Sequence, residues 1–167
     1  KFRRVTFQQL NMLEDDALAE LLCTHEQVLC IVNSRKAAQS IFSKLPDEGS
    51  FHLSTLMVPK HRRAVLEEIR RRLNDGLPCR VVSTSLVEAG VDIDFPAVYR
   101  ELAGLDSILQ AAGRCNREGK RAAEDSIVTI FRRTEDAPPL FKRNIRITNN
   151  ALKDNADPAA CLLYTSD

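Results

Sequence analysis

Short apolar runs recur along most of the chain and alternate with more polar stretches. Residues 28–32 read Val-Leu-Cys-Ile-Val, and shorter apolar segments lie at 51–53, 79–83, 97–102 and 126–131. Continuous apolar runs of this length are typical of strands buried on both faces, as in a parallel sheet. The pattern therefore predicts five strands.

The stretches between these runs carry apolar residues at helical spacing. The clearest set is Ala37, Ala38, Ile41, Phe42 and Leu45, preceded by Asn33-Ser34 as a turn and cap. Another helix is predicted from Pro59, whose missing N–H costs nothing at a helix start, to the Asn-Asp-Gly stop at 74–76. Helices are also expected from Asp15 through Leu22 and over 105–112.

This alternation of strands and helices predicts an α/β fold with a mostly parallel central sheet and helices on both faces. In such sheets, functional residues lie on loops beyond the carboxyl ends of the strands. The loops after Val32, Leu53, Ser83 and Leu102 should therefore share one edge.

Composition narrows the class of protein. The 167 residues are 44% hydrophobic and 28% charged, as in one soluble globular domain. No apolar run approaches the ~20 residues that span a bilayer, and no signal peptide is expected after the basic start at 1–4. The net charge of +1 means that any nucleic-acid binding must depend on local patches. The five cysteines form no CxxC pair and indicate reduced thiols of a cytoplasmic protein, without a metal site.

Two polar segments are the candidates for chemistry. Residues 83–94 run from a strand into a loop with hydroxyls, a glycine and carboxylates, and 110–117 read Gln-Ala-Ala-Gly-Arg-Cys-Asn-Arg. Arginines three residues apart on a helical turn, here Arg114 and Arg117, point the same way and suit phosphate oxygens. Gly113 would allow close backbone approach, and Gln110 could orient a water or touch a terminal phosphate.

Each of these residues also has an ordinary structural interpretation. Arg114 and Arg117 could form a solvated helix end, Asp92 could be a turn carboxylate, and Thr84 and Ser85 could cap helices. Their order and spacing together favour a functional role.

These segments resemble the motifs of superfamily 2 helicases. Residues 84–92 resemble motif V, 110–117 match the Q-x-x-G-R-x-x-R pattern of motif VI, 31–35 fit motif IV, and 52–54 fit the motif that follows it. The motifs occur in the family's order, and the resemblance covers roughly 26–131. The amino-acid sequence of residues 81–120 is similar to that of the helicase part of the CRISPR-associated type I helicase-nuclease.

The resemblance implies a three-layer RecA-like lobe that completes an ATP site against a first lobe, which would hold Mg²⁺. It implies that Gly90 and Asp92 meet the ribose side and that Arg114 and Arg117 are arginine fingers at the γ-phosphate. Gln110 and Gly113 would lie beside them. Glu88 either links the ATP and DNA edges or is an ordinary exposed carboxylate.

The resemblance implies that nucleic acid crosses the top of both lobes and is gripped as a single strand. The resemblance gives as phosphate contacts Ser34, Arg35, Ser54, Thr84 and Ser85. The arginines of the helix from Pro59 could form a backbone-binding patch, but a solvated face with internal salt bridges is the favoured interpretation. Arg62 and Arg63, nearest the carboxyl end of the strand, are the better candidates for a contact there, and His52 could be a satisfied core histidine.

Other features bear on how the lobe would work. The sequence lacks a G-x-x-x-x-G-K-[ST] loop, an acidic Mg²⁺ motif and a histidine-aspartate nuclease motif. We therefore expect negligible ATPase and nuclease activity from this chain alone. The expected partners are single-stranded DNA, a first lobe in the same full-length chain and an RNA-guided surveillance complex, with no membrane.

Domain bounds and alternatives complete the expectations. Residues 1–135 are predicted to form the lobe, 136–160 a peripheral helical segment, and 161–167 to be a non-native tail. Two alternatives stay open: a lobe of an RNA helicase or restriction translocase, and a non-catalytic nucleic-acid-binding module of RecA-like fold.

Overall fold

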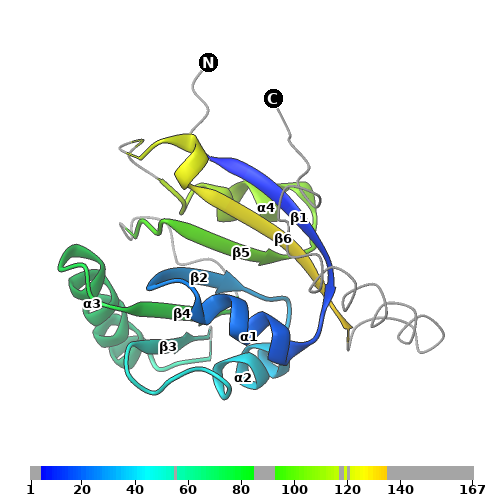
Figure 1. Ribbon diagram of the computed structural model, residues 1–167. Coiled ribbons are helices and arrows are strands. Elements are labelled where there is room, and N and C mark those ends of the chain that lie inside the picture. The colour runs from blue at the N-terminus through cyan, green and yellow to red at the C-terminus, as the bar shows by residue number, and fades with distance from the viewer. Residues whose placement is uncertain (1–4, 55, 85–92, 117–118, 120, 135–167) are drawn as a thin grey trace.

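The central feature is a single all-parallel sheet. The computed structural model describes residues 5–54, 56–84, 93–116, 119 and 121–134. Six strands pair in the order β1-β6-β5-β2-β4-β3 (Figure 1). The strands are β1 (Thr6–Leu13), β2 (Gln27–Ile31), β3 (Ser50–Leu53), β4 (Cys79–Ser83), β5 (Ala97–Glu101) and β6 (Ile127–Arg133). The five predicted strands and their parallel arrangement are confirmed.

Four α-helices lie in the described part of the chain. They are α1 (Asp15–Cys23), α2 (Arg35–Phe42), α3 (Pro59–Asn74) and α4 (Leu105–Ala112), followed by the short 3-10 helix η1 (Ala123–Asp125). The predicted start of α3 at Pro59 is confirmed, and Gly76 beyond its end has a φ of 70°. None of the helices in these described segments has the length and apolar character needed to cross a membrane.

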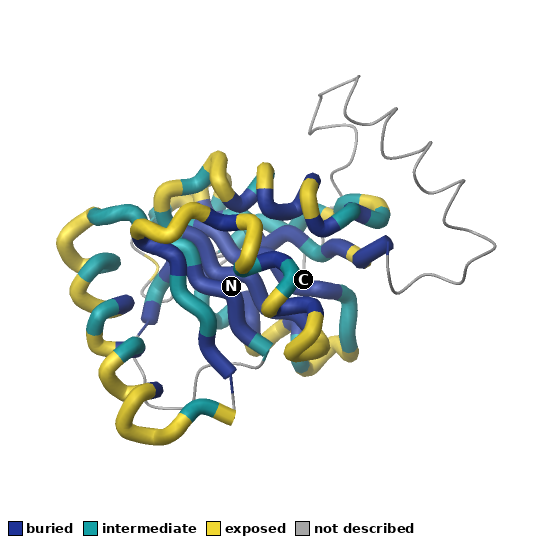
Figure 2. Tube along the Cα trace, turned by 90° about the horizontal axis from the view of Figure 1, so that it is seen from below, coloured by how far each residue is buried: buried dark blue, intermediate teal, exposed yellow. Residues whose placement is uncertain are grey.

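Two hydrophobic cores lie on the two faces of the sheet. Because side chains alternate along a strand, Val28 and Cys30 of β2 join the core under α1 and α2, whereas Leu29 and Ile31 join the core under α3 and α4. Figure 1 shows α1 and α2 in front of the sheet and α4 behind it. Figure 2 shows the buried strands as the middle layer, with exposed outer helix surfaces. The prediction of helices on both faces is confirmed.

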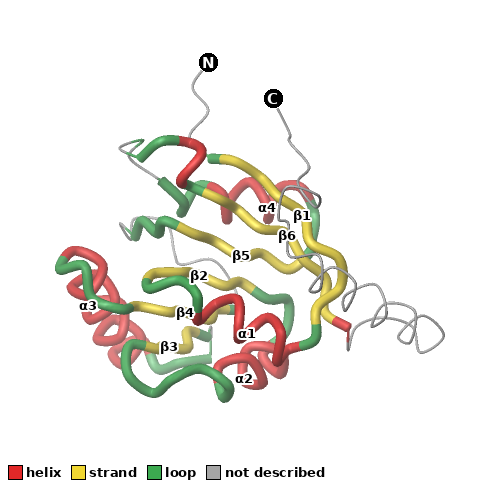
Figure 3. The backbone as a smooth tube through the Cα atoms, in the orientation of Figure 1, coloured by secondary structure: helices red, strands yellow, loops and turns green. Residues whose placement is uncertain are grey.

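Strand β1 is a strand that the hydrophobic pattern does not predict. Its sequence Thr-Phe-Gln-Gln-Leu-Asn-Met-Leu is rich in amides, and most of its residues are only half-buried. It forms an edge of the sheet and pairs in parallel with β6 (Figure 3). The Gln8 side chain donates a hydrogen bond to the Thr129 hydroxyl at 2.9 Å. A polar edge strand of this kind is stabilised by pairing with a strand that is distant in sequence, and such pairing cannot be predicted from the local sequence.

A buried ion pair ties helix α1 to strand β6. Asp15, the first residue of α1, accepts hydrogen bonds from Arg133 Nε at 2.9 Å and Nη2 at 2.8 Å. Both side chains are 7% exposed. The Ser40 hydroxyl of α2 donates to the same carboxylate at 2.7 Å. Three elements that are distant in sequence therefore meet on one carboxylate.

We predict that Asp15→Ala lowers the free energy of unfolding by about 3–5 kcal/mol, because Arg133 would stay buried without its counter-charge. Urea unfolding of the chain measures this change. Asp16→Ala is the control, since Asp16 is 81% exposed and pairs with Lys44 at the surface. Its cost should stay below about 1 kcal/mol. Equal costs for the two variants would contradict the structural role assigned to Asp15.

Candidate functional site

The carboxyl ends of four neighbouring strands form the candidate site. Since β3, β4, β2 and β5 are all parallel, the loops that follow them leave at the same edge. Backbone hydrogen bonds join these ends: Val32 N donates to Ser83 O at 2.9 Å, and Thr84 N donates to Leu53 O at 3.4 Å. The expectation that these loops share one edge is confirmed.

The loop after β2 brings Ser34 and Arg35 to the surface. The Ser34 hydroxyl accepts a hydrogen bond from Ala37 N at 3.1 Å and caps α2, which confirms the predicted cap. Both residues are exposed. A hydroxyl that accepts a hydrogen bond can still donate one, so this cap is compatible with a phosphate contact. That contact itself stays a prediction.

The turn after β3 is supported from inside by an arginine. Arg62 is only 8% exposed, and its Nη1 donates to Ser54 O at 2.5 Å. The Ser54 hydroxyl accepts from Leu56 N at 3.2 Å. The burial of Arg62 favours support of the Ser54 turn over direct contact with a phosphate. A phosphate contact by Ser54 or Arg62 stays a prediction.

His52 of β3 packs against the second helix. Its ring stacks on Phe42 with a centroid separation of 5.7 Å. Partial burial lowers the pKa of the His52 imidazole and so favours the neutral ring. The ring therefore packs as the core interpretation expects, but its buried Nε2 has no hydrogen-bond partner among the described residues, so it is not a fully satisfied core histidine.

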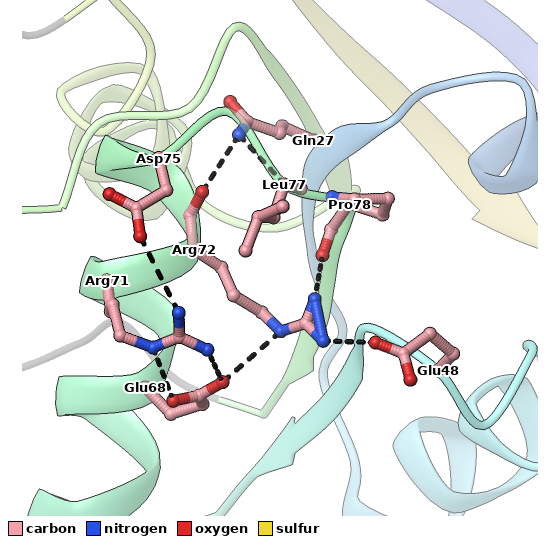
Figure 4. A network of polar contacts seen from close by, with 8 residues as sticks. All are labelled: Gln27, Glu48, Glu68, Arg71, Arg72, Asp75, Leu77 and Pro78. Carbon is pink, nitrogen blue, oxygen red and sulfur yellow. Dashed lines mark hydrogen bonds and ion pairs between the residues drawn. The ribbon is translucent and has the colours of Figure 1, made fainter.

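The arginines near the end of α3 are engaged in ion pairs, as Figure 4 shows. Arg71 contacts Glu68 at 2.6 Å and Asp75 at 3.5 Å. Arg72 pairs with Glu48 and donates to Pro78 O at 3.2 Å. These contacts confirm the interpretation of this part of α3 as a salt-bridged face. The network also lies beside the amino end of β2, away from the candidate site, because Gln27 contacts the same loop.

Helix α4 carries the first part of the predicted phosphate-binding segment. Ile108, Ala111 and Ala112 face the core, whereas Gln110 is exposed and Gly113 and Arg114 are half-buried. Phe95 N donates to Arg114 O at 2.9 Å, so the turn after α4 is pinned to the segment before β5. The neighbouring Cys115 is buried, which raises the pKa of its thiol to about 12.

Several predicted site residues lie outside the described residues. They are Ser85, Glu88, Gly90, Asp92 and Arg117. Of the predicted ATP and nucleic-acid contacts, the structure describes the hydroxyls Ser34, Ser54 and Thr84 and the residues Arg35, Arg62, Gln110, Gly113 and Arg114. The arrangement of Arg114 and Arg117 opposite Gly90 and Asp92 stays a prediction.

Asn116, in the segment that follows Arg114, is a positioning residue that sequence reasoning missed. It is 1% exposed and has a φ of 52°, in the left-handed region that Asn tolerates better than most residues. Its Nδ2 donates to Arg121 O at 2.7 Å, and its Oδ1 accepts from Arg121 N at 2.9 Å. The Asn116 side-chain amide therefore ties the segment that follows Arg114 and Cys115 to the backbone of Arg121. The sequence did offer one indication of this turn: Asn116 is followed three positions later by Gly119, and both residue types favour turns.

We predict that Asn116→Ala lowers the free energy of unfolding by about 2–4 kcal/mol, because it loses two buried hydrogen bonds and strains the left-handed backbone. Asn116→Gly loses the same hydrogen bonds but accepts this backbone conformation. Its cost should therefore be smaller by about 1 kcal/mol, after allowance for the flexibility of glycine in the unfolded state. Urea unfolding of the two variants measures the difference, and equal costs would argue against backbone strain at this position.

Known proteins are similar to this chain in sequence and in fold. The family model described as CRISPR-associated nuclease/helicase Cas3, C-terminal, matches residues 24–120. The Cas3 of Haloferax volcanii is 37% identical over 83 residues, which are 48% of this chain and 9% of the relative. The Cas3 of Methanothermobacter thermautotrophicus is 29% identical over 121 residues, or 70% of this chain and 15% of the relative. The chain thus spans a small part of these relatives.

Solved structures support the same assignment at the level of fold. The structure titled T. fusca Cas3-ADP matches with a TM-score of 0.62 and 17% identity, over 77% of this chain and 18% of that chain. The C-terminal domain of the DEAD-box protein Dbp5 matches with a TM-score of 0.60 and 14% identity, over 78% of each chain. These likenesses confirm the RecA-like fold. Because the family model covers more than half of the sequence, the chain belongs to the family of C-terminal domains of the CRISPR-associated nuclease/helicase Cas3, a lobe of a superfamily 2 helicase.

Proposed function

We propose that the chain is the second motor lobe of an ATP-dependent DNA helicase or translocase of type I CRISPR interference. One observation carries the proposal: the segments 31–35 and 52–54 and the start of 84–92, which match three of the four helicase motifs, lie at one carboxyl edge of a parallel sheet. This is the edge where α/β proteins of this kind place their ligands.

The residues after α4 would act on ATP bound between this lobe and a first lobe. Arg114 and Arg117 would neutralise negative charge that develops on the transferred phosphoryl group, the role of arginine fingers. Exposed Gln110 on α4 and half-buried Gly113 would complete this side of the site. Gly90, Asp92 and Glu88 would meet the nucleotide from the loop after β4.

The donor chemistry of these segments fits a triphosphate better than a metal ion. Guanidinium, amide and hydroxyl groups suit phosphate oxygens. Within the part of the chain that the structure describes, no group of three His, Cys, Asp or Glu side chains could hold a metal. We propose that Mg²⁺ is held by carboxylates of the first lobe, as the helicase resemblance implies, where it would offset the charge of the bound triphosphate.

Single-stranded DNA would lie along the hydroxyl-bearing loops. Ser34 and Arg35 are exposed and Thr84 is half-buried, and Ser54 and Ser85 belong to neighbouring loops of the same set. Hydroxyls and backbone N–H groups that contact phosphates fix the register of a strand without reading its bases. The proposed lobe would accordingly grip single strands with little sequence preference.

An apolar surface on α4 supports contact with another domain. Leu105 and Leu109 are 69% and 54% exposed and lie one turn apart, on the same helix as Gln110. Apolar side chains grouped in this way suit burial against a partner. We propose that the first lobe covers these two leucines and that this chain alone has negligible ATPase activity.

The proposed full-length protein also carries a fused nuclease and is recruited by an RNA-guided surveillance complex.

We predict that Arg114→Ala in the full-length protein lowers kcat for DNA-stimulated ATP hydrolysis by about 10³- to 10⁵-fold, the range found for arginine fingers. Binding of single-stranded DNA, measured by fluorescence anisotropy, should be retained. The control is Arg71→Ala on α3, whose guanidinium is held by Glu68 and Asp75 and which should leave kcat unchanged.

Two outcomes would redirect this proposal. Unchanged turnover in Arg114→Ala would favour a non-catalytic nucleic-acid-binding module. Stimulation of the wild-type protein by single-stranded RNA rather than DNA would favour an RNA helicase, since 2′-hydroxyl groups distinguish the two ligands.

A further inference from the structure

Two buried charged residues end strand β5 at the candidate site. Arg100 and Glu101 are 8% and 5% exposed and, as neighbours on a strand, point to opposite faces of the sheet. Charged side chains are rarely buried unless they are paired. Both contact the same residue, Asn33, in the loop between β2 and α2.

Asn33 makes hydrogen bonds through three of its polar groups. Its Oδ1 accepts from Arg100 Nη1 at 2.9 Å, and its backbone N donates to Glu101 Oε1 at 2.9 Å. Its Nδ2 donates to Leu102 O at 3.0 Å. Bonds that involve a charged partner are stronger than neutral ones. The amide is therefore fixed in one orientation although Asn33 itself is exposed.

These contacts begin where the backbone ladder stops. The parallel pairing of β2 with β5 runs from Leu29 opposite Val98 to Ile31 opposite Arg100. Beyond that point, the side chains of Asn33, Arg100 and Glu101 hold the two chain segments together. The sheet already aligns the two strands, so the extra contacts act on the loops that follow them.

The two loops that Asn33 joins serve the two halves of the proposed site. On one side, Asn33 directly precedes Ser34, which caps α2, and Arg35. On the other side, Leu102 lies three residues before α4, the helix of Gln110 that leads to Arg114. We infer that Asn33, Arg100 and Glu101 form a positioning unit that couples the loop of Ser34 and Arg35 to the helix that leads to Arg114. This inference rests on the proposed function.

A matched contact at the opposite end of β2 separates positioning from simple stability. The Gln27 amide Nε2 donates to Leu77 O at 3.0 Å and to Arg72 O at 3.4 Å (Figure 4). Like Asn33, Gln27 is an amide that ties β2 to a neighbouring loop. It lies beside the amino ends of the strands, away from the candidate site.

The experiment uses the full-length protein with Asn33→Ala, Asn33→Asp or Gln27→Ala. Asn33→Ala removes the hydrogen bonds to Arg100 and Leu102. Asn33→Asp keeps the shape and the acceptor for Arg100 but loses the donor to Leu102. ATP turnover is measured without DNA and with saturating single-stranded DNA, and Tm is measured for each variant.

We expect Asn33→Ala to lower DNA-stimulated turnover by about 10- to 100-fold, a loss that a misplacement of about 1 Å can cause. The ratio of stimulated to DNA-free turnover should fall with it, and Asn33→Asp should show a smaller fall in this ratio. Gln27→Ala should lower Tm while it keeps the wild-type ratio, because its contact does not reach either loop of the site.

A ratio for Asn33→Ala equal to that of Gln27→Ala would overturn the inference and leave the proposed function standing. If Asn33→Ala does not fold, the same comparison is made with Asn33→Asp, and a wild-type ratio in that variant overturns the inference. A wild-type protein whose ATP turnover does not respond to single-stranded DNA would instead overturn the proposed function, and the coupling would fall with it.

Discussion

The parallel pairing of β2 with β4 on one side and β5 on the other is the constraint on which the site depends. Together with the parallel pairing of β3 with β4, it sends the loops after four strands in the same direction and so brings together segments that are far apart in the sequence. Two hydrophobic cores, one on each face of the sheet, hold the strands in this register. The helices that follow β2 and β5 then begin at one common edge.

Buried polar side chains also fix the positions of the loops that follow the strands and helices. Arg62 supports the turn of Ser54 from inside, and Asn116 brackets the loop after Arg114. Arg100 and Glu101 meet on Asn33. Each of these groups is placed at the end of a strand or helix rather than in the middle of a core. A buried charge or amide that is fully hydrogen-bonded fixes one geometry, which is what a site shared with a second domain requires.

Much of the fold could be predicted from local sequence, because strands and helices differ in the period of their apolar residues. Pro59 and Ser34 also marked the starts of α3 and α2 correctly. Strand β1 could not be predicted in this way, since its polar residues are stabilised by pairing with β6 at the other end of the described chain.

The candidate site shows the same division. The motifs that contain Ser34, Thr84 and Arg114 could be read from residue order, but the residues that position them could not. Asn33 and its partner Arg100 are 67 residues apart, and no local pattern relates them. Arg62 illustrates the opposite case: its sequence position suggested a surface contact, whereas folding places it in the interior.

Hydrogen–deuterium exchange of the full-length protein, with and without a non-hydrolysable ATP analogue and single-stranded DNA, tests most directly whether the carboxyl edge is the ligand-binding surface. Amides that become occluded or more rigid exchange more slowly. The account predicts slower exchange at 33–35, 53–54 and 83–84 at the carboxyl edge, and also at 113–116, which lie beside the segment before β5. It predicts no change around 48–50 and 76–78, before β3 and β4. Protection confined to 48–50 and 76–78 would contradict it.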